Sequence, residues 1–82
     1  MLPLCFRYDG DFLVHYMSVE PDATVGDICE AAREYVSGYR VPEREGDLEL
    51  TFAGAVQPHD RLARDVGIGE LDYVQVDVVT TA

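Results

Sequence analysis

A single amphipathic helix is the feature that most constrains how this chain of 82 residues can fold. Its apolar side chains recur at the three- and four-residue spacing of one helical face, and charged residues occupy the opposite face. The apolar stripe consists of Val25, Ile28, Cys29, Ala32, Tyr35 and Val36. Thr24 is a suitable N-cap with Asp27 three residues later, and Gly38 is a suitable stop. We therefore expect one helix of about 13 residues, whose stripe must be buried against another layer.

Segments of alternating apolar and polar residues lie on both sides of this helix and predict the strands of that second layer. The predicted strands are residues 2–8, 12–19, 48–52, 55–57 and 73–79. A turn at residues 9–11 joins the first two, because Gly10 can adopt a positive φ. One helical turn is expected near residues 61–64. Since the first hairpin and the last strand enclose the helix, we expect the terminal strands to lie side by side.

This order of elements predicts an α+β domain of the β-grasp type, with a mixed four- to five-stranded sheet packed on one main helix. The domain is expected to span residues 1–79, and residues 80–82 to form a frayed tail. The passage from residue 19 to residue 28 resembles the strand-to-helix connection of ubiquitin-like folds. The same resemblance extends to the final loop and strand, at residues 60–62, 67–68 and 72–76. The expected fold is therefore a ubiquitin-like β-grasp.

The charge balance narrows the choice of partner. Sixteen acidic residues against six lysines and arginines give a formal net charge of −10, which phosphate backbones and anionic membranes would repel. We therefore expect neither a nucleic acid nor a membrane as partner. No apolar run approaches the roughly 20 residues that span a bilayer, and the N-terminus lacks the basic region of a signal peptide. The cytoplasm is the expected location.

Residue types that carry catalysis or hold metals are sparse. Cys5 and Cys29 lie among apolar neighbours and are expected to be buried free thiols, too few for a four-cysteine zinc or iron–sulfur site. His15 is expected on a strand face and His59 in a solvated loop, and no nucleophile, phosphate-loop or zinc-protease motif accompanies them. We expect no catalytic residue, no metal and no cofactor, and therefore not an enzyme. A modifier role is not expected either, because the sequence ends without a Gly-Gly pair.

The second predicted strand is apolar on both faces, which favours a protein interface. A two-layer fold leaves the outer face of the sheet open, so the residues of this strand that point away from the helix would form an exposed apolar patch. Arginine is also enriched at interfaces, and two arginines follow the helix. The candidate interface residues are Phe12, Val14, Tyr16, Tyr39, Arg40 and Arg44. The alternatives are ordinary surface exposure and, for the arginines, local neutralisation of Glu43 and Glu45.

A resemblance to one particular protein family covers the whole chain, and it is most specific in the first 46 residues. Pro3, the block Asp11-Phe12-Leu13-Val14, the pair Arg40-Val41 and the triplet Arg44-Glu45-Gly46 resemble the toluene monooxygenase system protein B (TmoB) family, without a gap in spacing. Weaker matches follow at Pro58, Asp60, Gly67-Ile68 and Asp77-Val78-Val79. One departure is the strand at residues 47–52, which is acidic and apolar where the family carries several basic residues.

The resemblance implies a non-catalytic γ subunit of a bacterial multicomponent monooxygenase. Such a subunit docks on a large hydroxylase α subunit, which holds the diiron centre and the substrate pocket, while electrons arrive from a reductase through a Rieske ferredoxin. This chain would supply no iron ligand. The alternative resemblance, around Pro42 to Gly46 and Gly67-Ile68, is to the small ubiquitin-like protein encoded with type VII secretion systems, an adaptor or regulator. The sequence leaves open a weak self-association of the isolated chain through exposed strand edges.

Overall fold

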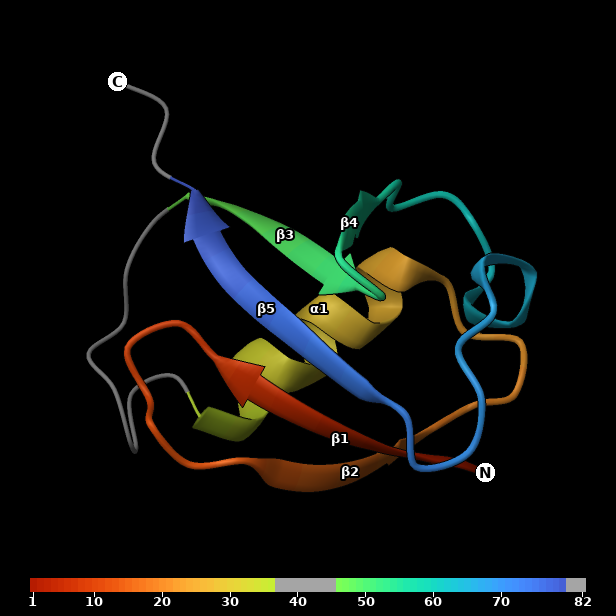
Figure 1. Ribbon diagram of the computed structural model, residues 1–82, viewed down its shortest axis with the longest axis horizontal. Helices are drawn as coiled ribbons and strands as arrows, with labels where there is room; N and C mark the ends of the chain where they lie inside the picture. The colour runs from red at the N-terminus through yellow and green to blue at the C-terminus, as the bar shows by residue number, and fades with distance from the viewer. Residues whose placement is uncertain (37–45, 80–82) are drawn as a thin grey trace.

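The computed structural model describes residues 1–36 and 46–79 and has the predicted order of elements in these ranges. The elements are β1 (Leu2–Tyr8), β2 (His15–Val19), α1 (Val25–Val36), β3 (Asp47–Phe52), β4 (Ala55–Gln57), a 3₁₀ turn η1 (Ala63–Val66) and β5 (Tyr73–Val79). The described strands form one five-stranded sheet in the order β2-β1-β5-β3-β4, and α1 lies behind it in Figure 1. The predicted β-grasp is therefore confirmed.

The terminal strands pair directly with each other, as the sequence predicts. β1 and β5 are parallel, whereas the other neighbouring strands are antiparallel. The register places Cys5 beside Tyr73 and Tyr8 beside Val76. Beyond the end of β1, Asp9 extends the attachment, because its N–H donates to Val76 O at 2.8 Å and its Oδ2 accepts Val78 N–H at 3.0 Å.

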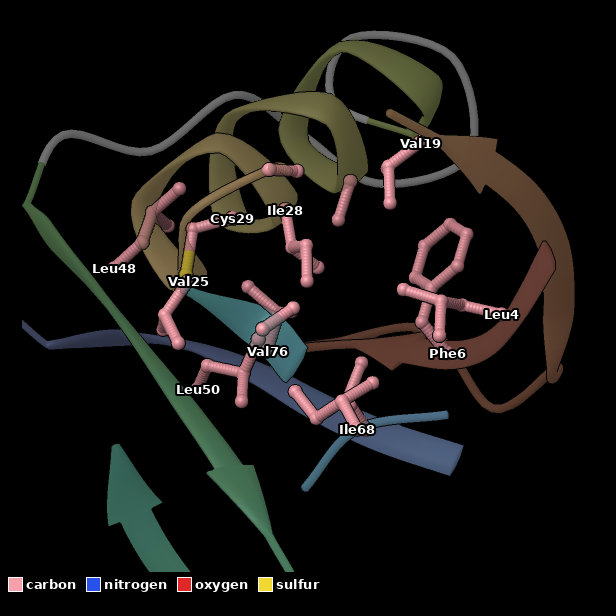
Figure 2. Packing of buried hydrophobic residues seen from close by; sticks show 14 of the residues in the cluster. Leu4, Phe6, Val19, Val25, Ile28, Cys29, Leu48, Leu50, Ile68 and Val76 are labelled. Carbon is pink, nitrogen blue, oxygen red and sulfur yellow. The ribbon is translucent and has the colours of Figure 1, made fainter. Parts of the chain in front are cut away.

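The core lies between α1 and one face of the sheet. Alternate residues of the strands point into it, and the helix contributes its apolar stripe, as Figure 2 shows. The largest side chains that are fully buried are Phe6, Leu4, Ile28, Leu50, Val25, Val36, Val74, Val76 and Cys29. Complete burial of a side chain such as Phe6 or Ile28 contributes about 1.5–3 kcal/mol of transfer free energy. Tyr35 departs from the predicted stripe, since 51% of it is exposed at the margin of the core.

The start of α1 is stabilised by a reciprocal cap. Thr24 Oγ1 accepts the N–H of Asp27 at 3.1 Å, and Asp27 Oδ2 accepts the N–H of Thr24 at 3.1 Å. The N–H groups of Val25 and Gly26 donate to carbonyl oxygens of the loop before η1, at 2.9 and 3.0 Å. Because these first amides all have partners, the helix N-terminus serves to attach that loop and leaves no free donor for an anion.

Two predicted boundaries were wrong, and two further predictions lie outside the described residues. The second strand begins at His15 and not at residue 12, because the Leu13 N–H donates to a carboxylate oxygen of Asp11 instead of joining the ladder. The helical turn predicted near residues 61–64 is a 3₁₀ turn two residues later, at η1. The expected helix stop at Gly38 and the expected frayed tail at residues 80–82 lie outside the described residues.

The cap gives a first prediction. Replacing Thr24 with alanine removes the acceptor for the Asp27 N–H and should lower the free energy of unfolding by about 1 kcal/mol. Urea unfolding of the two proteins measures this difference. Thr24→Ser is the matched control, because serine keeps the hydroxyl and should retain most of the stability. An equal loss in both variants would show that the cap is not the cause.

Candidate partner interface on the outer sheet face

The loop between β1 and β2 carries two of the predicted interface residues. Phe12 is 83% exposed and Val14 is 50% exposed, whereas Asp11, next to them, is buried. Its Oδ1 accepts the N–H of Leu13 at 3.0 Å, and its Oδ2 lies 2.8 Å from His15 Nε2. The buried carboxylate therefore holds the loop in a conformation that presents Phe12 to solvent.

Both histidines are engaged within the fold. The ring of His15 packs against Phe6 and Tyr35, with centroid distances of 5.5 and 5.4 Å, and these two rings also contact each other at 5.5 Å. Its Nε2 pairs with Asp11. His59 donates from Nε2 to Leu48 O and so attaches its loop to β3. Within residues 1–36 and 46–79, no three His, Cys, Asp or Glu side chains converge as a metal site would require. Both imidazoles therefore stabilise the fold through these contacts.

Tyr16 lies on the outer face of the sheet, in a row that crosses three strands. The registers place Cys5 beside Tyr16 on one side and beside Tyr73 on the other. Tyr16 is 67% exposed and Tyr73 is 47% exposed, with the half-buried Cys5 between them. Leu71, just before β5, is 57% exposed and donates its N–H to Pro3 O at 2.7 Å, which places it beside β1 at this end of the sheet.

Leu71 adopts an unfavourable backbone conformation. Its φ is +62°, in the left-handed region, which costs a residue with a large side chain about 1–2 kcal/mol. Its neighbours hold it there, because its N–H donates to Pro3 O and its carbonyl accepts the Cys5 thiol at 3.6 Å. Glycine or asparagine would fit this backbone at lower cost. The turn that the Asp72 N–H closes on Gly69 O at 3.1 Å thus holds an exposed leucine in this conformation.

Further along the sheet, polar side chains of β1, β3 and β5 lie on the outer face, together with the exposed Val56 and Val79. Gln75 Oε1 accepts from Tyr73 Oη at 2.8 Å and from Arg7 Nε at 3.1 Å, and Gln75 Nε2 donates to Asp77 Oδ1 at 3.1 Å. Glu49 of β3 lies directly opposite Asp77 of β5. The outer face therefore has an apolar end at Tyr16, Leu71 and Tyr73 and an acidic end, joined by a hydrogen-bonded chain.

The predicted interface residues lie partly in a loop, partly on a strand and partly outside the described residues. Phe12 and Val14 lie in the loop, and only Tyr16 lies on a strand of the outer face. Tyr39, Arg40 and Arg44 fall outside the described residues. Leu71 and Tyr73 were not among the interface residues predicted from the sequence. Alternation along the last strand already indicates that Tyr73 points outward, but its position beside Cys5 depends on the long-range pairing of β1 with β5.

The two cysteines differ in environment. Cys5 is half-buried on the outer face, whereas Cys29 is buried in the core. Burial, with a smaller contribution from the charge of Glu30, raises the pKa of the Cys29 thiol from 9.0 to about 12, and Arg33 opposes this shift only weakly. The prediction that both thiols are buried is therefore confirmed for Cys29, whereas Cys5 is only half-buried.

The raised pKa predicts that Cys29 resists alkylation in the folded protein. At pH 8 only about one Cys29 thiol in ten thousand would be ionised, and the thiolate is the reactive form. Iodoacetamide labelling followed by mass spectrometry should modify Cys5 alone until the chain is unfolded. Stability should also fall as the pH rises above 9, because the unfolded thiol ionises there and the folded thiol does not until about 12. Rapid labelling of Cys29 in the native protein would contradict this account.

The strain at Leu71 predicts an unusual result for an apolar-to-polar change. Leu71→Asn should leave the free energy of unfolding of the isolated chain unchanged or raise it by up to about 1 kcal/mol, because asparagine tolerates the left-handed conformation. Thermal unfolding measures the difference. A loss of more than about 1 kcal/mol would mean that the leucine side chain stabilises the fold itself.

Comparisons with solved structures show the fold. A chain of the toluene 4-monooxygenase HD complex with the inhibitor 4-bromobenzoate matches with a TM-score of 0.88 at 20% identity, covering 95% of this chain and 98% of that chain. The UBL domain of Plasmodium falciparum Dsk2 matches with a TM-score of 0.73 at 16% identity, covering 95% of this chain and 97% of that chain. The N-terminal ubiquitin-like domain in the 4931431F19Rik protein gives 0.73 at 17% identity, with coverages of 99% and 77%.

The comparison with protein families is more specific. No curated protein sequence matches the chain. The model of the family described as toluene-4-monooxygenase system protein B matches residues 1–78, which is nearly the whole sequence. This agrees with the resemblance carried by Pro3, by the block at residues 11–14 and by Gly46. The chain therefore belongs to the toluene-4-monooxygenase system protein B (TmoB) family.

Proposed function

We propose that this protein is the non-catalytic γ subunit of a multicomponent diiron monooxygenase of the toluene or aromatic type, and that it docks on the hydroxylase α subunit. The family match over residues 1–78 carries this proposal. A chain of the toluene 4-monooxygenase complex also has this fold over 98% of its length, which supports a role as a component of an assembly. On this proposal the iron ligands and the substrate pocket belong to the α subunit.

The arrangement of polar groups also supports a binding role. The imidazoles of His15 and His59 are both hydrogen-bonded within the domain.

In the part of the chain that the structure describes, no helix is long and apolar enough to cross a bilayer. The cytoplasm, where a monooxygenase would find its reductase and ferredoxin, is the proposed location.

A surface on paired strands suits an accessory subunit. The outer-face residues of β1, β2 and β5 lie on a sheet whose backbone is fixed by its ladders and by the core beneath it. A partner that binds there does not have to order a loop, so little conformational entropy is lost on association. The proposed work of the chain is therefore to support the α subunit with a rigid, preformed face.

Co-purification tests the proposed function. The tagged chain would be expressed with the hydroxylase and electron-transfer genes of its source, isolated, and examined by native mass spectrometry and iron analysis. Recovery in a fixed ratio with a large iron-containing subunit is the expected result. Isolation of the chain alone, or with a membrane-bound secretion component, would overturn the proposal.

Charge introduced at the predicted interface should weaken this assembly. Tyr16→Asp and Phe12→Asp each place a carboxylate where the surface is apolar and should reduce recovery of the α subunit at least about tenfold. Tyr16→Phe keeps the apolar ring and is the matched control that should assemble normally. Circular dichroism of each isolated variant verifies folding. Undiminished recovery with both aspartate variants would exclude this surface from the interface.

A further inference from the structure

The outer face of the sheet combines two kinds of surface at a fixed separation. Its apolar end contains Tyr16, Leu71 and Tyr73, which are 67%, 57% and 47% exposed. Its acidic end contains Glu49 and Asp77, which are directly opposite in neighbouring strands. Tyr73 and Asp77 both point outward on β5, and four residues of strand separate them by about 13 Å. A partner that covers this face therefore meets apolar contacts and negative charge together.

The side chains between the two ends are held in place. Gln75 bonds to Tyr73 Oη and to Arg7 Nε through its oxygen, and to Asp77 through its nitrogen. These bonds orient the phenol at one end and the carboxylate at the other. The arrangement is thus organised before any partner arrives, which favours a single mode of binding.

The acidic end favours a partner with a positive charge at this position. Like charges directly opposite each other destabilise a pair of strands. In the described part of the chain, neither Glu49 nor Asp77 forms an ion pair, although Asp77 accepts the hydrogen bond from Gln75. A lysine or arginine from a partner would relieve the repulsion between the two carboxylates. The net charge of the whole sequence, −10, would also attract a basic surface at long range.

The strained leucine points to the other half of the contact. Leu71 keeps a φ of +62° and an exposed side chain, although a smaller polar residue would fit its backbone better. It adjoins the row of Tyr16, Cys5 and Tyr73 through its hydrogen bonds to Pro3 and Cys5. Its exposed side chain therefore adds apolar surface beside Tyr16 and Tyr73.

We infer that the outer sheet face binds a surface of the hydroxylase α subunit that is apolar at one end and basic at the other. Apolar side chains of the α subunit pack on Tyr16, Leu71 and Tyr73, and a lysine or arginine lies between Glu49 and Asp77. The inference rests on the proposed function, because it takes the α subunit to be the partner. It goes further in assigning the partner's chemistry and the orientation of the contact.

The apolar half is tested by calorimetric titration of the full chain into the hydroxylase purified without this chain. Leu71→Asn should weaken binding at least about tenfold, as for a central interface residue. Leu71→Met has the same backbone strain but keeps an apolar side chain, and it should bind within about twofold of the wild type.

The charged half is tested by a pair of double variants with equal net charge. Glu49→Gln with Asp77→Asn should weaken binding several-fold and reduce its dependence on salt between about 50 and 500 mM. Glu30→Gln with Glu34→Gln removes the same number of charges from α1, on the opposite layer, and should leave both quantities close to wild type. This comparison separates the proposed local contact from long-range attraction.

The possible outcomes test the inference about the outer face separately from the proposed function. Loss of binding with Leu71→Asn and with the outer-face double variant, but not with their controls, supports the inference. Normal binding of the wild type and of both test variants overturns the inference and leaves the proposed function standing. Equal weakening by the two double variants shows that only net charge matters and overturns the ion-pair assignment. Failure of the wild type to bind the hydroxylase overturns the proposed function and the inference together.

Discussion

The parallel pairing of β1 with β5 is the contact on which the rest of this structure depends. It joins segments from the two ends of the chain into one sheet. On the inner face it places Phe6 beside Val74 under α1, and on the outer face it places Cys5 beside Tyr73. Because strand residues alternate between faces, a slip of one residue would expose the core and bury the outer surface. One register thus fixes both the stability of the domain and the surface it presents.

Most elements of the fold could be predicted from the sequence because they depend on interactions between residues that are close in the chain. The stripe on α1, the cap at Thr24 and the alternation of the strands are interactions between near neighbours, and they located most elements correctly. The candidate site was predicted less completely. Asp11 reads as an ordinary turn residue, and its burial beside His15 is visible only when the strands are paired. Leu71 carries no sequence signal for a left-handed conformation, because bulky residues rarely adopt it.

The matches to solved structures show the fold, whereas the match to the family model shows the family. Ubiquitin-like domains share the architecture at low identity, as the Dsk2 domain does at 16%, so the fold by itself does not indicate a function. The surface of this chain has a row in which Tyr16 and Tyr73 flank Cys5, and two carboxylates face each other further along the sheet. Membership of the TmoB family gives that surface a context in which a partner is expected. The physical account and the family assignment therefore favour the same role, a binding subunit.

The most direct measurement is hydroxyl-radical footprinting of tyrosine side chains in the free chain and in the isolated complex. Tyr73 on the outer face and Tyr35 on α1 have nearly equal exposure, 47% and 51%, so each serves as the reference for the other. The account predicts that oxidation of Tyr16 and Tyr73 falls in the complex while oxidation of Tyr35 does not change. Protection of Tyr35 with Tyr16 and Tyr73 still fully reactive would contradict it, because the helical layer would then be the docking surface.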